Sequence, residues 1–247
     1  MRTIPHWIAG ADTTGASTRF GPVYNPATGA QQAQVALAGP SDVDAAVQAA
    51  KKAFDEWRDA TPENFVFAVK ASRFITHNKK LKDPENAVDN LLPRAVRLGK
   101  KLGPVLFQLP PKWRINVERL RNLLLILPRE IRYAFEFREL SWMTAEVCAT
   151  LQEFNAAFCI YELAGYHSRL SITADFTYVR LHGPERGKYQ GSYSEQQLSQ
   201  WARQIERWAQ QLKAVYVYFD NDQAGYAAAN ALRLREMIFG QSLKRAS

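Results

Sequence analysis

Three predicted strands of this chain become polar at their carboxyl ends, and this pattern limits the possible folds more than any other feature. The stretch FTYVRLHG, residues 176–183, is rich in β-branched and aromatic residues and is followed by Pro184, as expected of a strand. Arg180 and His182 share one face of it, because side chains alternate along a strand. Charged side chains are costly to bury in a packed sheet, so this face indicates a functional site.

The same change occurs in two other segments. In RYAFEFR, Glu136 and Arg138 alternate with Phe135 and Phe137. In VYVYFDND, Asp220 and Asp222 follow an aromatic run. Parallel strands place their carboxyl ends on one rim of a (β/α) barrel or an open α/β sheet, which is where such folds carry their sites. The pattern therefore predicts an α/β fold with a site on that rim.

Six strand-like segments alternate with helical segments from residue 61 onward. Strands are expected at residues 65–71, 104–111, 132–138, 156–163, 176–183 and 214–221, and helices at 84–102, 117–127, 144–154, 194–212 and 223–239. Such alternation is typical of parallel βαβ units with right-handed crossovers. Six strands are two fewer than a closed eight-stranded barrel requires, so we expect an incomplete TIM-barrel-like sheet.

The first 60 residues have a different character. Residues 1–40 are rich in Gly, Thr, Ala and Pro, and a short hairpin is predicted between residues 23–24 and 34–37. Ser41 is predicted to cap a helix that reaches Trp57 with one apolar stripe.

The runs HWIAG, VYNPATGAQQAQVALAGPSDVDAAVQAAKKAFDEW and RDATP resemble the extreme N-terminus of the aldehyde dehydrogenase superfamily, closest to its methylmalonate-semialdehyde dehydrogenase branch. The resemblance covers residues 1–60 and implies a small hairpin and first helix. The glycine-rich cofactor turn and the catalytic cysteine setting of that family have no counterpart in this sequence, so no aldehyde dehydrogenase activity is expected.

From residue 61 a second resemblance begins. The segments TPENFVFAVKASRFITH, KLGPVLFQLPP, FEFRELSW, DFTYVRLHG, KYQGSY and VYVYFDND occur in this order and are similar to the DUF72 family, which includes the YecE-like proteins. The resemblance covers residues 61–231 and implies a TIM-barrel-like fold of unestablished function. The first two strands of the family, one with a Gly, Ser and Trp motif and one with a Glu and Asn motif, are missing.

We therefore predict a fusion of two unrelated fragments. The join is expected between Trp57 and Phe65, where both families have a Trp followed by a Thr-Pro pair. The predicted parts are an aldehyde dehydrogenase-like fragment at 1–60, a partial barrel at 61–240 and a basic tail at 241–247.

Two residue pairs on the rim carry the predicted chemistry. Glu136 and Arg138 lie two residues apart on one face, where the arginine would lower the pKa of the carboxylate. A structural ion pair inside the barrel is the alternative. Arg180 and His182 could hold a phosphate or carboxylate. We predict Glu136 and His182 as acid and base, and the two arginines as contacts to an anionic substrate.

Further residues predicted to bind the substrate lie at strand ends or in the loops that follow them: Lys70, His77, Gln108, Tyr189, Tyr193 and Asn221. Each has a structural alternative. Lys70 could be a solvated lysine, and His77 could brace its own loop. A buried Gln108 amide needs partners in either case. The two tyrosines form a loop that suits a lid or packs on the rim.

No metal or cofactor is predicted. Asp220, Asn221 and Asp222 resemble half of a hard-metal site that Glu136 and His182 could complete, but no two-histidine spacing supports zinc. The sequence also has no glycine-rich phosphate loop.

The charge distribution suggests an anionic partner, and solvated surface lysines and arginines are the alternative explanation. The net charge is +8, and residues 1–62 hold five basic and six acidic residues, so the remaining chain carries +9. An anionic small molecule is the preferred partner, and nucleic acid or an acidic protein is the alternative. No basic run or recognition-helix motif supports nucleic-acid binding.

The remaining expectations concern compartment and assembly. No apolar run approaches the roughly eighteen residues of a membrane span, and the start lacks an apolar signal-peptide stretch, which predicts a cytoplasmic protein. Cys148 and Cys159 are expected to be free thiols. The open edges of an incomplete sheet predict low stability, self-association and impaired activity of the monomer.

Overall fold

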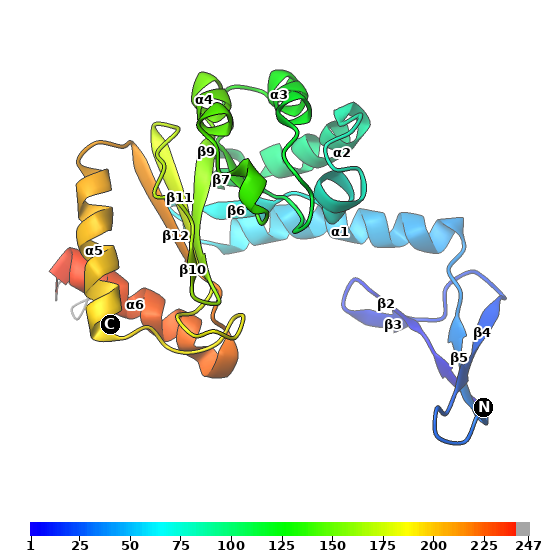
Figure 1. Ribbon diagram of the computed structural model, residues 1–247. Coiled ribbons are helices and arrows are strands. Elements are labelled where there is room, and N and C mark those ends of the chain that lie inside the picture. The colour runs from blue at the N-terminus through cyan, green and yellow to red at the C-terminus, as the bar shows by residue number, and fades with distance from the viewer. Residues whose placement is uncertain (241–247) are drawn as a thin grey trace. The chain divides into compact units, whose positions relative to one another are not determined.

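The structure is a computed structural model that describes residues 1–240, apart from the side chains at positions 51 and 54. It divides into two compact units (Figure 1). The first unit comprises residues 1–66 and 93–102, and the second comprises residues 67–92 and the chain from 103 onward. The predicted basic tail, residues 241–247, lies outside the described residues.

The second unit is built on a sheet of six strands that follow one another across the sheet in chain order. They are β6 (Phe67–Lys70), β7 (Leu102–Gln108), β8 (Tyr133–Glu136), β9 (Ala157–Leu163), β11 (Phe176–Leu181) and β12 (Ala214–Phe219). A short strand, β10 (Tyr166–His167), pairs antiparallel with β9. The predicted α/β fold with six parallel strands, a curled half-barrel, is confirmed.

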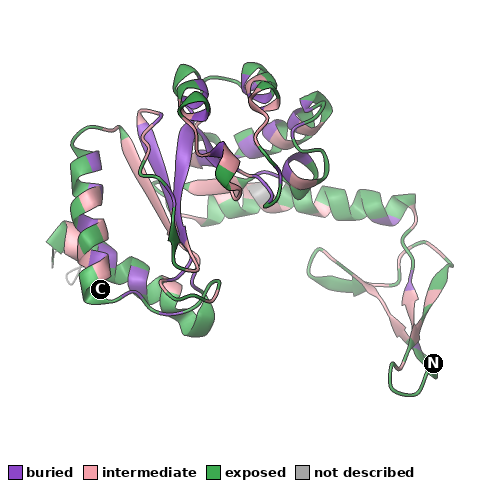
Figure 2. Cartoon of the chain, in the orientation of Figure 1, coloured by how far each residue is buried: buried purple, intermediate pink, exposed green. Residues whose placement is uncertain are grey.

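Helices cover one face of this sheet. They are α2 (Glu85–Ala95), α3 (Val117–Ile126), α4 (Ala145–Glu153), α5 (Glu195–Ala209) and α6 (Tyr226–Phe239). Alternate strand residues such as Phe107, Phe135 and Val179 pack against the apolar stripes of these helices in one core. The buried strands are purple in Figure 2. Asn116 and Ser194 cap α3 and α5 by accepting hydrogen bonds from backbone N–H groups.

Two predicted helices are shorter than expected. The helix predicted at 84–102 ends at Ala95 and continues as a 3₁₀ turn, η2 (Val96–Lys101), in which Gly99 has a φ of +56°. Pro93 lies inside α2 and removes a backbone donor there. The helix predicted from residue 223 begins at Tyr226, after the turn η4 (Gln223–Gly225). Two other turns, η1 (Phe74–Asn78) and η3 (Leu140–Trp142), follow β6 and β8.

The first unit contains small sheets of its own. Strand β5 (Gln31–Ala36) lies between β1 (Arg2–Ile4), which is parallel to it, and β4 (Phe20–Tyr24), which is antiparallel. Strands β2 (His6–Ile8) and β3 (Ala11–Thr13) form a separate hairpin.

The long helix α1 (Pro40–Ala60) follows these strands, and its start corrects the predicted Ser41 cap. Gly39 is the N-cap and Pro40 occupies the first turn, where a missing N–H is tolerated. The Asp42 carboxylate accepts hydrogen bonds from the backbone N–H groups of Gly39 at 2.8 Å and Ala16 at 2.7 Å.

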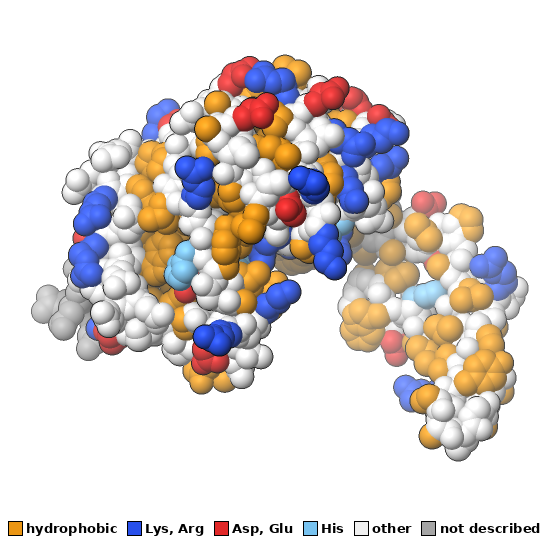
Figure 3. Space-filling view, viewed as in Figure 1, with side chains coloured by type: hydrophobic (Ala, Val, Ile, Leu, Met, Phe, Trp, Pro, Cys, Tyr) orange, Lys and Arg blue, Asp and Glu red, His pale blue; other side chains and the backbone are white. Residues whose placement is uncertain are grey.

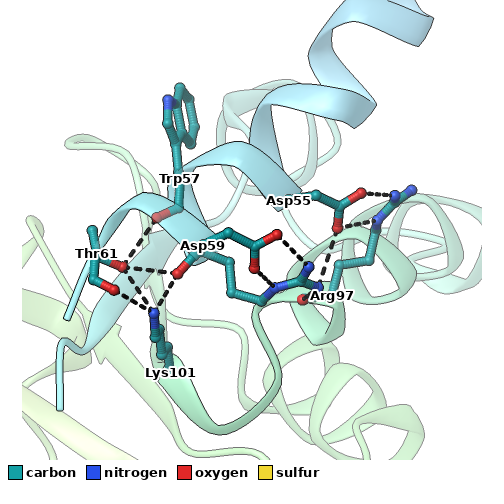
Figure 4. Close-up of polar contacts among 7 residues, drawn as sticks. Asp55, Trp57, Asp59, Thr61, Arg97 and Lys101 are labelled. Carbon is teal, nitrogen blue, oxygen red and sulfur yellow. Dashed lines mark hydrogen bonds and ion pairs between the residues drawn. The ribbon is translucent and has the colours of Figure 1, made fainter. Parts of the chain in front are cut away.

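Polar contacts attach the end of α1 to residues 93–102 of the same unit (Figure 4). The Arg97 guanidinium is paired with the Asp55 carboxylate. The Lys101 ammonium donates to the Thr61 carbonyl oxygen at 2.7 Å and to the Arg58 carbonyl oxygen. These contacts explain why residues 93–102 group with the N-terminal segment. Within residues 1–240, no helix is long and apolar enough to cross a membrane.

Candidate functional site

The sheet face opposite the helices carries the polar residues. Strand register places Gln108 beside Glu136, and it places Tyr161 and Tyr218 on either side of Arg180. Residues at the same level of neighbouring parallel strands share a face when they are in register. The strand ends therefore bring residues distant in the sequence into two neighbouring rows on the inner face of the half-barrel, with Gln108 and Glu136 one step before the row of Arg180.

Glu136 is the centre of the polar contacts on this face and has no exposed surface. Its Oε2 atom accepts a hydrogen bond from Arg180 Nη1 at 2.7 Å, and its Oε1 atom accepts one from Arg138 Nε. Arg180 Nη2 donates to Asp220 Oδ1 at 3.0 Å, and Arg180 Nη1 lies 3.4 Å from Gln108 Oε1. The two guanidinium groups are thus held on either side of one buried carboxylate.

His182 is also fully buried and fixes Arg138. Arg138 Nη2 lies 2.9 Å from His182 Nε2. A guanidinium only donates, so Nε2 accepts and the ring proton resides on Nδ1, which lies 3.5 Å from Asp220 Oδ2. Burial, then the charges of Arg180 and Arg138, lower the pKa of His182 to about 2. The imidazole is therefore neutral, and both of its nitrogens face protein groups.

Lys70 and Asp220 are the more accessible titratable groups. Lys70 ends β6 and is exposed. Its side-chain ammonium has no hydrogen bond or ion pair with any described residue. Burial, then the charge of Arg180, lowers its pKa, while Glu136 and Asp220 act in the opposite direction. The Asp220 side chain is 28% exposed, and burial raises its pKa despite the opposing charge of Arg180.

An aromatic ring lies beneath the arginines. The Arg138 guanidinium carbon is 4.8 Å from the centre of the Tyr161 ring, and the Tyr161 hydroxyl donates to the Phe137 carbonyl oxygen at 2.9 Å. Cys159 Sγ is 3.8 Å from Glu136 Oε2, and burial raises the pKa of this thiol, so it is unreactive. Cys159 and Cys148 are both free, as predicted.

The polar residues described above form one cluster, which comprises Lys70, Gln108, Glu136, Arg138, Tyr161, Arg180, His182 and Asp220. The loop after β11 carries Tyr189 to this cluster. The Tyr189 ring centre lies 5.3 Å from that of His182, in an edge-to-face arrangement, and the side chain is 46% exposed. Gly183 allows the loop to fold back, because its φ is +105° and a Cβ atom there would lie 2.1 Å from the Gln190 carbonyl oxygen.

Three predicted binding residues make their hydrogen bonds elsewhere. The Tyr193 hydroxyl accepts from the Gly183 backbone N–H at 3.0 Å. Asn221 Nδ2 donates to the Gly191 carbonyl oxygen at 2.8 Å, and His77 Nδ1 lies 2.9 Å from Thr76 Oγ1. In the described part of the chain, no hydrogen bond or ion pair joins these three residues to the cluster. Their role in binding stays a prediction.

Two residues of the cluster were not among the predicted binding residues. The sequence suggests Asp220 as a polar strand end and a metal ligand, and it gives Tyr161 no role, although the alternation within β9 and the register with Arg180 place Tyr161 on the same face. Across the described residues, no group of three or more His, Cys, Asp or Glu side chains is placed to hold a metal ion.

The comparisons with known proteins agree with this arrangement of strands. The family model described as protein of unknown function DUF72 matches residues 47–246. The UPF0759 protein YunF of Bacillus subtilis is 27% identical over 253 aligned positions, which cover 87% of this chain and 90% of that protein.

Solved structures show the same fold. A DUF72 family protein from Thermotoga maritima has a TM-score of 0.70 and 28% identity, covering 76% of this chain and 79% of that one. A DUF72 family protein from Enterococcus faecalis has a TM-score of 0.67 and 22% identity, covering 76% and 80%.

The N-terminal segment is similar to another family. The aldehyde dehydrogenase family model matches residues 13–72, which overlap the DUF72 match from residue 47 onward. Malonate-semialdehyde dehydrogenase 2 of Shouchella clausii is 40% identical over 58 residues, and the matched part spans 12% of that enzyme. The chain belongs to the DUF72 family, and a short N-terminal segment of it is similar to aldehyde dehydrogenases.

Proposed function

We propose that the rim cluster binds an anionic small molecule and supports acid–base chemistry of a hydrolase, lyase or isomerase type. The observation that supports this proposal is the convergence of cationic side chains around one buried carboxylate. Three cationic side chains, Lys70, Arg138 and Arg180, interact electrostatically with two acidic ones, Glu136 and Asp220. Converging, pre-oriented guanidinium groups suit carboxylate or phosphate oxygens.

The geometry favours a division of roles among these residues. Glu136 and His182, which the sequence suggests as acid and base, are buried and orient the two arginines. Lys70 and Asp220 have shifted pKa values and accessible surface, which suits proton transfer to or from a bound molecule. The proposal therefore assigns anion contacts to the two arginines and to Lys70, and proton transfer to Lys70 and Asp220. The proposal also holds that the activity of this chain is weak, since the ends of the family's first two strands are missing from the rim.

Replacing Lys70 with Ala is expected to weaken binding of a small anion by about tenfold, because one charge-assisted hydrogen bond contributes roughly 1.5–3 kcal/mol. The probes are inorganic phosphate and small dicarboxylates, titrated into the full chain by calorimetry. Lys79→Ala is the matched control, since Lys79 is a nearby lysine that lies over the Phe74 ring. Equal affinities for the wild type and both variants would contradict the proposed site.

Nucleic-acid binding is the alternative that the net charge suggests. On the face shown in Figure 3, lysine and arginine side chains are interspersed with acidic ones over the region of α2 to α4. A mixed-sequence oligonucleotide belongs in the same titrations. Tight binding of it that weakens steeply with salt, without any binding of small anions, would favour this alternative over the small-molecule site.

A further inference from the structure

Strand β12 leaves one edge of the six-stranded sheet open. It pairs with β11 on one side and ends the sheet on the other, as the described residues show. All six β12 residues are half-buried, whereas five of the six β11 residues are buried (Figure 2). Alternate backbone N–H and C=O groups of a terminal strand point away from its sheet, so β12 offers a row of hydrogen-bonding groups to another strand.

An apolar groove runs along the helix-facing side of the same strand. It has a volume of about 430 Å³ and is lined by Val215, Val217 and Phe219 of β12, together with residues of α5 and α6 that include Ile205, Leu234 and Phe239. The Phe239 side chain is 66% exposed. An unpaired backbone edge and an uncovered apolar surface therefore coincide on one element.

The other terminal strand, β6, is better protected. It has four residues and ends at Lys70, and short strands with a lysine are common protections against edge pairing. The β12 sequence AVYVYF contains no charge and no proline. It has the β-branched and aromatic composition that favours strand pairing.

We propose that β12 docks against β12 of a second copy of this chain, antiparallel, about a twofold axis through Val217. A twofold axis perpendicular to the sheet makes the two strands antiparallel and keeps the groove sides of both copies on one face. In this register Val217 meets Val217, and Val215 of each copy lies opposite Phe219 of the other. These three positions all line the groove. The pairing therefore joins the two apolar grooves while it satisfies the two open edges.

The charges beside the strand complement one another in this arrangement. Lys213 directly precedes β12 and is paired at 2.8 Å with Asp175 Oδ2 of its own chain, with its side chain 73% exposed, and Asp220 and Asp222 follow the strand. Antiparallel pairing centred on Val217 places Lys213 of one copy opposite Asn221 of the other, between the two aspartates. Asp222 is exposed and has no partner among the described residues. Parallel association would instead bring like charges together at each end of the strand, which disfavours it.

A cysteine at position 217 tests the axis directly. Opposite residues of an antiparallel pair have Cα atoms about 4.5–5.5 Å apart, which lies within the range that a disulfide bridges. The full-length Val217→Cys variant, oxidised with diamide, is expected to form a covalent dimer on non-reducing gels. Val69→Cys on β6 is the matched control, and the wild type controls for the half-buried Cys148. A monomeric Val217→Cys variant, or cross-linking through Val69→Cys instead, would overturn the proposal.

A charge exchange provides a second measurement that does not depend on cross-linking. By light scattering after size exclusion, Lys213→Asp is expected to raise the dimer dissociation constant about fivefold, since two exposed ion pairs are lost. Adding Asp222→Lys is expected to restore it. Thermal melts of both variants distinguish a folding defect from lost association. A monomeric wild type at high protein concentration, or a double variant no better than Lys213→Asp, would contradict the pairing.

Discussion

Replacing Glu136 with Gln is expected to lower the free energy of unfolding by about 3–5 kcal/mol, because the substitution leaves Arg138 without a counter-charge and leaves Arg180 with Asp220 alone. The Glu136 side chain has no exposed surface, and those of Arg138 and Arg180 are 8% and 12% exposed. With a neutral amide at position 136, the two guanidinium groups would repel each other in a poorly solvated place. Urea denaturation at neutral pH measures the change.

The matched control is Glu153→Gln. Glu153 makes two hydrogen bonds of 2.7 Å with Arg121, and the side chains are 51% and 43% exposed. Water screens such a surface pair, so its loss is expected to cost about 1 kcal/mol or less. Equal losses for the two variants would mean that the cluster is solvated and that Glu136 does not hold the arginines in place.

The order and type of the strands could be predicted because their signals are local. Continuous apolar runs such as those in β7 and β9 indicate strands that are buried on both faces. The prediction of a helix at 84–102 was wrong at its end, because the chain turns at Gly99. The contacts of Arg97 and Lys101 in that turn involve residues about 40 positions earlier. Such long-range contacts leave no periodic signal in the sequence.

The candidate site was predictable up to the ends of the strands. Glu136 and Arg180 share a face because the strand period is two, and the parallel register places Glu136 level with Tyr178, only two residues before Arg180. Beyond a strand end the alternation no longer applies. Asn221 follows β12 and turns toward Gly191, because the path of the loop, with Gly183 and Gly191 at positive φ, determines what lies beside it.

The role of His182 could not be predicted from the sequence for a related reason. Its position at a strand end suggests an acid or base, since a histidine there commonly titrates near neutral pH. Its protonation depends instead first on burial, and then on the charges of Arg180, two residues before it, and of Arg138, which follows β8. Two cations beside a buried imidazole oppose its protonation.

The His182→Gln variant is expected to be less sensitive to acid than the wild type. The pKa of His182 is about 2 in the folded protein, and the value for an unfolded chain is about 6.5. As the pH falls below 6.5, the unfolded state takes up a proton that the folded state does not. The stabilisation that His182 contributes above pH 6.5 is therefore lost as the pH falls. The loss is about 1.4 kcal/mol per pH unit until the pKa of the folded state is reached.

The measurement is urea denaturation of both proteins between pH 8 and pH 4.5. At pH 8 the side chain is uncharged in both states, so the difference in unfolding free energy reports only lost packing and hydrogen bonding. Between pH 7 and pH 4.5 the advantage of the wild type should shrink by roughly 3 kcal/mol. Asp220, whose raised pKa makes an opposite contribution at lower pH, remains in both proteins and largely cancels from the comparison. A difference that stays constant with pH would mean that His182 takes up its proton equally in both states. The assignment of a neutral His182 imidazole that orients Arg138 would then be wrong.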